Sequence, residues 1–249
     1  MSDIKKCIIV FSGLSRLWQE AFPSFKRNFL DKYDTDIYAC LWTECGFYSG
    51  RSYVHAPGDE YVKTTEDDKG FNTSGKLMDV NGFMEAYEPK VLKLLDFSKY
   101  EHIFDEKTKG LNGYTRPKNT LAQAFMVQEA MKLVPRYDVG PDTLIVRARP
   151  DFVIDQDVGG FNLDTFYTFK FRNKHNQGTG DMIQIGNYVN MERFAKMYDQ
   201  ASYLYEINNV SCPHIYTKGM IDWEHIPWEE LHVQGHCAHS PNGPYTESE

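Results

Sequence analysis

The sequence lacks the signals of several common protein classes. Its 249 residues include five cysteines, an odd number without a C-x-x-C pair, which argues against a disulfide framework. The net charge is −8, whereas general nucleic-acid binders carry a basic surface, so no nucleic-acid partner is expected. No apolar run is long enough for an integral membrane segment, and the opening MSDIKKCIIVFSG does not read as a signal peptide. The sequence therefore predicts a cytoplasmic protein, of a cell or of an infected host.

Two widespread nucleotide-binding motifs are also missing. Neither G-x-G-x-x-G nor G-x-x-x-x-G-K-[ST] occurs anywhere in the chain. The first motif binds the diphosphate of NAD or FAD, and the second cradles the phosphates of ATP or GTP. The commonest NAD- and ATP-binding designs are therefore excluded, although a local basic pocket for a phosphorylated small molecule stays compatible with the acidic total charge.

The chain opens with a strand–helix–strand pattern. Residues 7–11 form a continuous apolar run, which is typical of a buried parallel strand. Phe22, Phe25 and Phe29 follow at helical spacing, and residues 36–42 read as a second strand. This βαβ opening predicts an α/β fold in which helices cover a mixed, mainly parallel sheet.

Further elements follow along the chain, and one domain is expected over residues 1–249, with a flexible tail at 240–249. Residues 44–82 are glycine-containing and weakly periodic, which predicts a long loop. Thr120 and Gln123 have capping-box spacing, so one helix is expected to begin at Thr120. The other predicted helices are 83–95, interrupted or begun near Pro89, and a continuous 191–205. The other predicted strands are 100–104, 143–146, 166–171 and 181–186.

The predicted strand in TLIVRARPDFVIDQD (residues 143–157) ends in a cluster of charges. Alternation directs Arg147, Arg149 and Asp151 to one face of the strand. Buried guanidinium groups need partners or a ligand. The two arginines suit the oxygens of a diphosphate, or one of them orients the aspartate. Asp151 is placed to hold Mg²⁺ or Mn²⁺. A solvated strand end with an Arg–Asp salt bridge is the simpler alternative.

Ligands of open α/β sheets bind outside the carboxyl ends of the strands. This rule selects residues 12–16, residues 147–157 and the loop that precedes Asp181. Within the second segment, Asp155-Gln156-Asp157 matches the D-x-D pattern of many metal-dependent sugar transferases. Because three-letter acidic patterns are common by chance, Asp151 is preferred as the metal ligand.

Four segments in this order resemble a family of small glycosyltransferases found in capsule and surface-polysaccharide clusters and in some large viruses and phages. They are FSGLSRLWQEAFPSFKRNFLDKYDTDIYACLWT, RPKNTLAQAFMVQEAMKLV, LIVRARPDFVI and DMIQIGNYVNMERFAKMYD. The shared elements are a first strand ending in G-x-x-R, an R-P-x-N-T helix start, an R-x-R-x-D strand and a D-x-x-x-x-G segment. The resemblance covers roughly two thirds of the chain.

The resemblance implies a GT-A-like fold, that of nucleotide-diphospho-sugar transferases. Ser12, Gly13 and Arg16 would border the nucleotide, and Asp151 would stand at the position of the metal-binding aspartate. The element here is R-x-R-x-D, which departs from D-x-D and puts the use of metal in question.

Three further residues are candidates for the same cleft. Asn119 and Gln123 lie one helical turn apart and reach the cleft together, or else cap the start of their helix. Asp181, carried by the loop NKHNQGTG, is the candidate general base for an acceptor hydroxyl, with inversion of the anomeric centre. In the alternative, Asp181 binds hydroxyls of the donor sugar.

A histidine-rich segment, HVQGHCAH at 232–239, superficially resembles a transition-metal site. Some GT-A enzymes take a late histidine as a metal ligand, so His236, or in the alternative His232, is the candidate that completes a shell with Asp151. The alternative is a set of exposed histidines without a ligand role.

The leading hypothesis is a hexosyl- or pentosyltransferase that uses a UDP- or GDP-linked sugar, a glycan acceptor and Mn²⁺ or Mg²⁺. A sugar-nucleotide nucleotidyltransferase would need a longer glycine-rich basic loop than SGLSR at 12–16. A nucleotide-sugar or glycan-binding protein without catalysis is the other alternative. A homodimer is compatible with the sequence.

Overall fold

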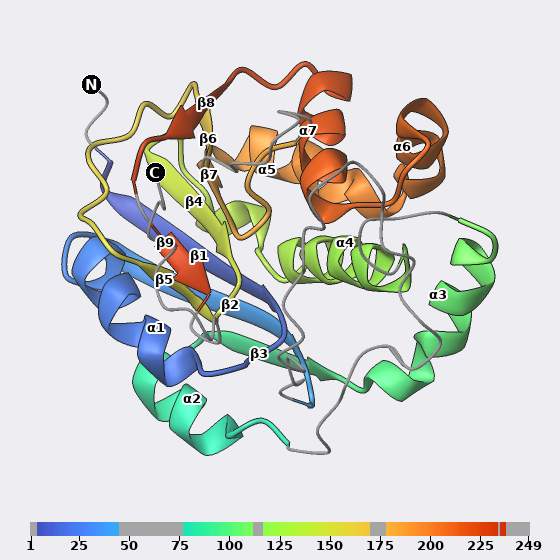
Figure 1. Ribbon diagram of the computed structural model, residues 1–249. Coiled ribbons are helices and arrows are strands. Elements are labelled where there is room, and N and C mark those ends of the chain that lie inside the picture. The colour runs from blue at the N-terminus through green and yellow to red at the C-terminus, as the bar shows by residue number, and fades with distance from the viewer. Residues whose placement is uncertain (1–3, 45–76, 112–116, 170–177, 234, 238–249) are drawn as a thin grey trace, which may run out of the picture.

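The computed structural model describes residues 4–44, 77–111, 117–169, 178–233 and 235–237 (Figure 1). The strands are β1 (Lys6–Gly13), β2 (Asp34–Trp42), β3 (Val91–Leu95), β4 (Thr143–Ala148), β5 (Phe152–Ile154), β6 (Phe166–Phe169), β7 (Ile183–Gly186), β8 (Trp228–Leu231) and β9 (Gly235–Cys237). The α-helices are α1 (Trp18–Phe25), α2 (Val80–Tyr87), α3 (Glu101–Thr108), α4 (Pro117–Met131), α5 (Tyr188–Phe194), α6 (Ala201–Asn208) and α7 (Pro213–Trp223).

The main sheet has seven strands in the order β3-β2-β1-β4-β7-β6-β8, and β5 pairs with β9 in a separate two-stranded sheet. The first four strands of this order are parallel, whereas β7 is antiparallel to both of its neighbours. The predicted α/β class with a mixed, mainly parallel sheet and flanking helices is confirmed.

The reversed direction of β7 brings a late segment to the carboxyl edge of the parallel strands. Ala148, the last residue of β4, lies opposite Ile183, the first residue of β7. Asp181 therefore lies beside the end of β4, although it precedes its own strand. This edge collects the segments that follow β1 and β4 and the segment that precedes β7.

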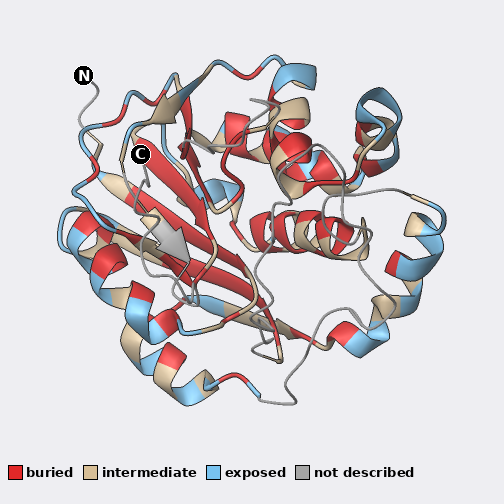
Figure 2. Cartoon of the chain, viewed as in Figure 1, coloured by how far each residue is buried: buried red, intermediate tan, exposed pale blue. Residues whose placement is uncertain are grey.

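Helices cover both faces of the sheet, because the buried strands alternate between two cores (Figures 1 and 2). In β1, Ile8 and Val10 face the layer of α4, α5 and α7, whereas Ile9 and Phe11 face α1 and α2. Arg147 follows Ile145 at the same parity in β4, so its side chain points toward the α4 and α7 layer.

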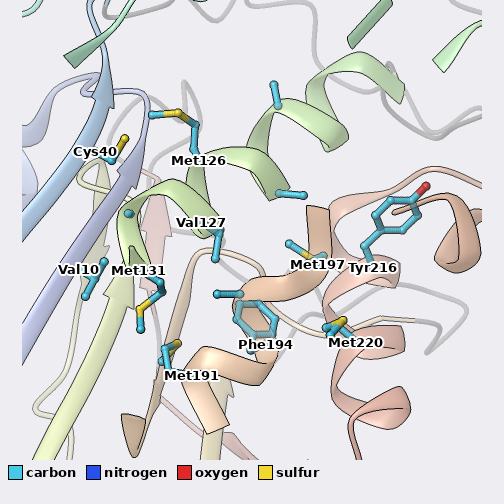
Figure 3. Packing of buried hydrophobic residues seen from close by; sticks show 14 of the residues in the cluster. Val10, Cys40, Met126, Val127, Met131, Met191, Phe194, Met197, Tyr216 and Met220 are labelled. Carbon is cyan, nitrogen blue, oxygen red and sulfur yellow. The ribbon is translucent and has the colours of Figure 1, made fainter. Parts of the chain in front are cut away.

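The two cores differ in chemistry. The α1 and α2 side is rich in aromatic rings, for example Phe11 and Phe25, which pack edge to face with centroids 5.0 Å apart. On the other side, flexible methionine side chains fill the space between α4, α5, α7 and the 3₁₀ turn Ala195–Tyr198 (Figure 3). The methionines of this helical layer are Met126, Met131, Met191, Met197 and Met220, all buried.

The helix predicted over 83–95, interrupted or begun near Pro89, was right only for 83–87, because the segment divides into α2 and β3. Glu88 takes a left-handed conformation with φ 45° after α2, and Pro89 cannot continue a helix. Residues 91–95 then pair in parallel with β2, which places Leu95 in the core. A helical and an extended segment therefore meet inside one apolar stretch.

The predicted strand over 100–104 was also wrong, because this segment begins α3. Tyr100 and Phe104 are four residues apart, a spacing that brings both rings to one side of a helix. Their centroids lie 6.5 Å apart, and both rings contact Trp42. The pattern was too short to separate the two periodicities.

The two other helix predictions were right in type and wrong in extent. α4 begins at Pro117, so Thr120 is a buried residue of the first turn and not the cap. The single helix expected over 191–205 breaks into α5, a 3₁₀ turn and α6. The tighter 3₁₀ turn keeps Met197 in the core and lets α6 start in a new direction against α7.

The cysteines whose side chains the structure describes form no disulfide. Cys7 and Cys40 are buried and free, as expected of small apolar side chains, and so is Cys212. Most of the loop predicted at 44–82 and the tail at 240–249 lie outside the described residues. In the described part of the chain, no helix combines the length and the apolar character that crossing a membrane requires.

Candidate functional site

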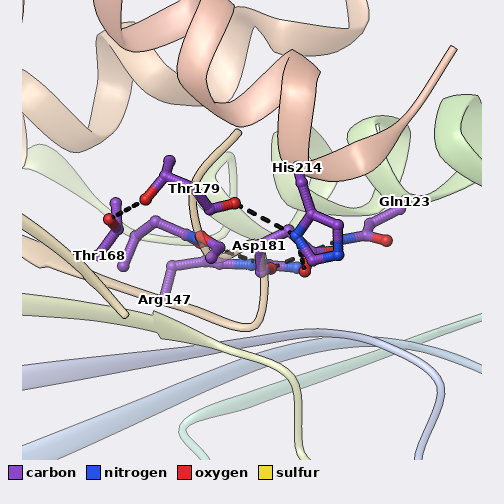
Figure 4. Close-up of polar contacts among 8 residues, drawn as sticks. Gln123, Arg147, Thr168, Thr179, Asp181 and His214 are labelled. Atoms are coloured by element: carbon purple, nitrogen blue, oxygen red, sulfur yellow. Dashed lines mark hydrogen bonds and ion pairs between the residues drawn. The ribbon is translucent and has the colours of Figure 1, made fainter. Parts of the chain in front are cut away.

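A buried polar cluster occupies the carboxyl edge of β1 and β4, between the sheet and the layer of α4 and α7 (Figure 4). Its side chains come from five segments: Ser12 and Arg16 from β1 and the following loop, Gln123 from α4, Arg147, Arg149 and Asp151 from β4 and the following turn, Thr179 and Asp181 before β7, and His214 from α7. The structure thus brings together most of the residues that the sequence singled out.

Arg147 is the anchor of the cluster, with 1% of its surface exposed. Its Nε donates to Ser12 Oγ at 2.8 Å, and Nη1 donates to the carbonyl oxygen of Asp181 at 2.6 Å and to Gln184 Oε1 at 2.9 Å. Burial lowers the pKa of Arg147 to about 9, although the Asp181 carboxylate acts in the opposite direction. The guanidinium is therefore charged at neutral pH and ties three strands together.

Asp151 is fully buried and lies between two arginines. Arg149 makes a two-pronged contact with it, from Nε to Oδ1 at 2.9 Å and from Nη2 to Oδ2 at 2.7 Å. Arg16 Nε lies 3.5 Å from Oδ2. The arginine side chains are 13% and 14% exposed, so they form the accessible layer above a buried carboxylate.

Gly13 gives the chain the turn that places Arg16 here. It ends β1 with φ 107°, a conformation that favours glycine. A Cβ atom at this position would meet no atom within 4 Å. The glycine is therefore explained by its backbone conformation and not by a shortage of space.

The described residues around Asp151 do not fit a divalent cation. Both carboxylate oxygens face guanidinium groups, and the positive charges of Arg16 and Arg149 oppose a second cation at the same oxygens. No group of three histidine, cysteine, aspartate or glutamate side chains suited to a metal occurs among the described residues. His236 in β9 pairs through its backbone with Val153 in β5, and the structure describes only the backbone of this histidine.

The D-x-D segment lies elsewhere. Asp155 and Asp157 are exposed, and Asp157 forms an ion pair with Lys32. Lys32 precedes β2, so this pair lies at the amino edge of the parallel strands, opposite the polar cluster. Asp151, by contrast, follows β4 at the carboxyl edge of the parallel strands.

Asp181 is held on both sides of its carboxylate. Gln123 Nε2 donates to Oδ2 at 2.6 Å, and His214 Nδ1 lies 3.1 Å from Oδ1. The second contact has an ion-pair distance without good hydrogen-bond angles, so Oδ1 receives no well-formed hydrogen bond from the described residues. Burial raises the pKa of Asp181, but His214, Arg149, Gln123 and Arg147 together outweigh it, and the pKa lies below its usual value.

The segment before Asp181 fits closely against the start of α7. Thr179 donates its backbone N–H to the carbonyl oxygen of His214 at 3.2 Å, and His214 Nδ1 lies 3.2 Å from the carbonyl oxygen of Thr179. A Cβ at Gly178 would lie 2.9 Å from the backbone of His214. Glycine at this position therefore permits the approach that sets the imidazole beside Asp181.

The two α4 candidates differ in their contacts. Gln123 reaches the cluster and binds Asp181, so its predicted alternative role as a helix cap was wrong. Asn119 lies one turn earlier, and its Oδ1 is buried without a hydrogen-bond partner among the described residues. A ligand amine or hydroxyl would satisfy this oxygen.

Three residues of the cluster were missed by the sequence reasoning. Gln184 lies directly opposite Arg147 in the β4–β7 pair, and a polar residue inside a buried strand was an available signal. For Thr179 and His214 the sequence contains no such signal, because their contacts depend on how α7 packs against the segment before β7. Pro213 predicts a helix start, but not its neighbour in space.

The ionised Asp181 should contribute to stability above acidic pH. Its folded-state pKa is lowered, so the contribution is present above the ordinary aspartate pKa of about 3.9 and disappears as the pH falls through the folded value. Urea unfolding followed by circular dichroism between about pH 5 and 2 should show a steeper loss of stability for the wild type than for Asp181→Asn. The exposed Asp164→Asn variant should retain the wild-type slope, and equal slopes for all three proteins would contradict the expectation.

Comparison with known proteins finds matches among solved structures only. No family model matches the chain, and no curated protein matches it. Solved structures do match, among them the apo form of mouse xyloside xylosyltransferase 1. The sequence identity is 10%, the TM-score is 0.42, and the match covers 92% of this chain and 85% of that one. At this level of similarity, the match carries no conclusion about mechanism, metal or donor.

Proposed function

We propose that this chain is a GT-A-like glycosyltransferase that moves a hexosyl or pentosyl group from a UDP- or GDP-linked sugar to a glycan acceptor. The observation that carries the proposal is the pair Arg16 and Arg149 above the buried Asp151, at the carboxyl edge of β1 and β4. Open α/β sheets bind their ligands at this edge, and guanidinium groups match the oxygens of a diphosphate.

Charge supports a diphosphate as the ligand. The described cluster contains three guanidinium groups, from Arg16, Arg147 and Arg149, and two carboxylates, from Asp151 and Asp181, which sum to +1 (three minus two) before any charge on His214. An incoming diphosphate brings negative charge to an edge with a positive excess. Developing charge on the departing nucleotide is stabilised by the same groups.

Each candidate residue has a role in this proposal. Arg16 and Arg149 hold the diphosphate, and Asp151 fixes their direction. The buried Arg147 supports the site from below through Ser12 and the backbone of Asp181. No step depends on a metal ion, because the described residues at Asp151 favour arginine as the partner.

The remaining roles concern the transferred sugar. Asn119 and Gln123 line the α4 side, where the buried oxygen of Asn119 suits a sugar hydroxyl. Asp181 lies on the acceptor side, and attack from the face opposite the nucleotide would invert the anomeric centre.

Thermal-shift measurements with UDP, GDP, CDP and their sugar conjugates test the donor site. At 100 times the dissociation constant, a bound nucleotide should stabilise the protein by about 2.7 kcal/mol. Arg149→Ala should weaken binding at least tenfold, roughly 1.4 kcal/mol or more, because a charged hydrogen-bonding partner of the phosphate is lost. The exposed Arg136→Ala is the matched control and should bind like the wild type.

The same experiment separates the alternatives. EDTA should leave the shift unchanged; a shift that requires Mn²⁺ and disappears in Asp151→Asn would instead assign a metal to this carboxylate. Binding without sugar release, unaltered by Asp181→Asn, would indicate a nucleotide-sugar binding protein. Absence of stabilisation by every nucleoside diphosphate and conjugate would contradict the proposal as a whole.

A further inference from the structure

The position of His214 decides which of its ring nitrogens is protonated. Among the described residues, Nδ1 faces the carbonyl oxygen of Thr179 at 3.2 Å and Asp181 Oδ1 at 3.1 Å. Both are acceptors, so Nδ1 must supply the proton in either contact. In the neutral ring, the lone pair therefore lies on Nε2, the nitrogen turned away from this pair of acceptors.

Asp181 itself is poorly suited to remove a proton from an acceptor. Its side chain is 3% exposed, whereas that of His214 is 17% exposed. Gln123 already donates to Oδ2. The pKa of Asp181 is lowered, since the nearby positive charges outweigh the effect of burial, and a weaker base gains less in general base catalysis. An acceptor hydroxyl can reach the imidazole more readily than the carboxylate.

The surroundings of the imidazole favour proton transfer through it. Among the described residues, the charged groups that act on Asp181 besides His214 are Arg147 and Arg149. Directly before α7, burial raises the pKa of the Cys212 thiol, so this neighbour stays neutral. Asp181 is the negative charge in contact with the ring, and it would stabilise the imidazolium that forms.

We infer that His214 and Asp181 form a catalytic dyad, in which His214 Nε2 takes the proton of the acceptor and Asp181 orients the ring. The inference rests on the proposed function and assigns its general base. The acceptor oxygen forms a bond to the anomeric carbon as its proton passes to Nε2. The bond from that carbon to the diphosphate oxygen breaks, and its electron pair leaves with the nucleotide. The proton on Nε2 then passes to solvent.

His214→Asn tests the dyad, because the side-chain amide of asparagine can place an N–H where Nδ1–H lies. The contacts with Asp181 and Thr179 can then persist while the Nε2 base is lost. Turnover should fall on the order of 10²- to 10⁴-fold, with nucleotide affinity unchanged. The assay is release of sugar from UDP-glucose, UDP-galactose and GDP-mannose, with water and with mixed oligosaccharides as acceptors. His225→Asn, an exposed change that suits the left-handed backbone at φ 50°, should keep wild-type turnover.

Asp181→Asn separates a positioning role from a structural one. Turnover should fall by a similar factor, and the double variant should be little worse than either single variant, because the two residues act as a unit. The decline in wild-type activity on acidification should be lost from the residual activity of His214→Asn. A purely structural role would leave the shape of the pH profile unchanged. Wild-type turnover in His214→Asn would overturn the dyad and leave the transferase proposal standing.

A measurement without turnover tests the same geometry. Nitrogen-15 NMR of labelled imidazoles, with His214→Asn to assign the signal, should show the Nδ1–H form for the neutral ring. The Nε2–H form would overturn the inference even if the protein transfers sugar. Failure of the wild type to bind nucleotide or release sugar would remove the proposed function, and with it the catalytic role of the dyad, whatever form the ring adopts.

Discussion

Asp151→Ala is expected to lower the free energy of unfolding by about 4 kcal/mol, within the range for removing one partner of a buried ion pair. The carboxylate is fully buried, and it is shared by Arg149, which contacts both oxygens, and Arg16 at 3.5 Å. Without it, the two guanidinium groups face each other at the end of β4. They are 13% and 14% exposed, so water can compensate only a part of the loss.

Asp155→Ala is the matched control, since it makes the same chemical change four residues further on at an exposed position. Its effect should stay within about 0.5 kcal/mol, as for most surface substitutions. Urea denaturation followed by circular dichroism and by tryptophan fluorescence gives both values. Equal effects of the two substitutions would show that Asp151 does not hold the arginines in the folded protein.

Arg147→Met is expected to lower the free energy of unfolding by about 3 kcal/mol, the lower end of the range for breaking a buried pair. The change removes the donor of three acceptors, namely Ser12 Oγ, the carbonyl oxygen of Asp181 and Gln184 Oε1. It also removes the desolvation of a buried charge, which lowers the pKa of Arg147 to about 9. The second effect offsets a part of the first, so the loss should be smaller than for Asp151→Ala.

Arg136→Met provides the comparison for this variant. Its side chain is 75% exposed, and its ion pair with Glu192 lies at the surface, so the expected effect is below about 0.5 kcal/mol. The same urea titrations measure it. A stability of Arg147→Met at or above that of the wild type would mean that the buried charge weakens the fold and is retained for function alone.

The parts of the fold that could be predicted are those with a clear apolar pattern, either a continuous apolar run or a stripe of apolar residues at helical spacing. Residues 7–11 and 36–42 read correctly as strands because every position in a buried parallel strand favours apolar side chains. The helix predicted from Phe22, Phe25 and Phe29 is α1, which continues as a π-helical turn over Lys26–Leu30. Here local pattern and tertiary packing agree.

Prediction of helix or strand failed in two segments, one where a single backbone conformation ends a helix and one where tertiary packing selects the helix. Glu88 ends α2 in a left-handed conformation, and Pro89 marks an interruption there, but the apolar residues of 91–95 do not show that the chain continues as a strand. At 100–104, two aromatic residues fit either a strand or a helix, and packing against Trp42 selects the helix. Both errors lie outside the candidate site.

The candidate site could be predicted where its residues lie close together in the sequence or at the same edge of the sheet. Arg147, Arg149 and Asp151 are neighbours in sequence, and the rule for sheet edges connects them with Arg16 and Asp181. His214 is different, because 33 positions separate it from Asp181 and only the packing of α7 brings the two together. The direction of β7, which sets Asp181 beside β4, was likewise not readable from the pattern of residues 181–186.

The buried methionines on one side of the sheet provide a chemical measure of how often the helical layer opens. Oxidation of a methionine thioether to the sulfoxide needs contact with the oxidant, and Met126, Met131, Met191, Met197 and Met220 are closed off from solvent in the folded chain. Their rate of modification by dilute peroxide therefore follows how often this layer opens. The layer includes α4 and α7, which carry Gln123 and His214. Mass spectrometry of the five sulfoxides would therefore measure local opening of the helices that cover the polar cluster.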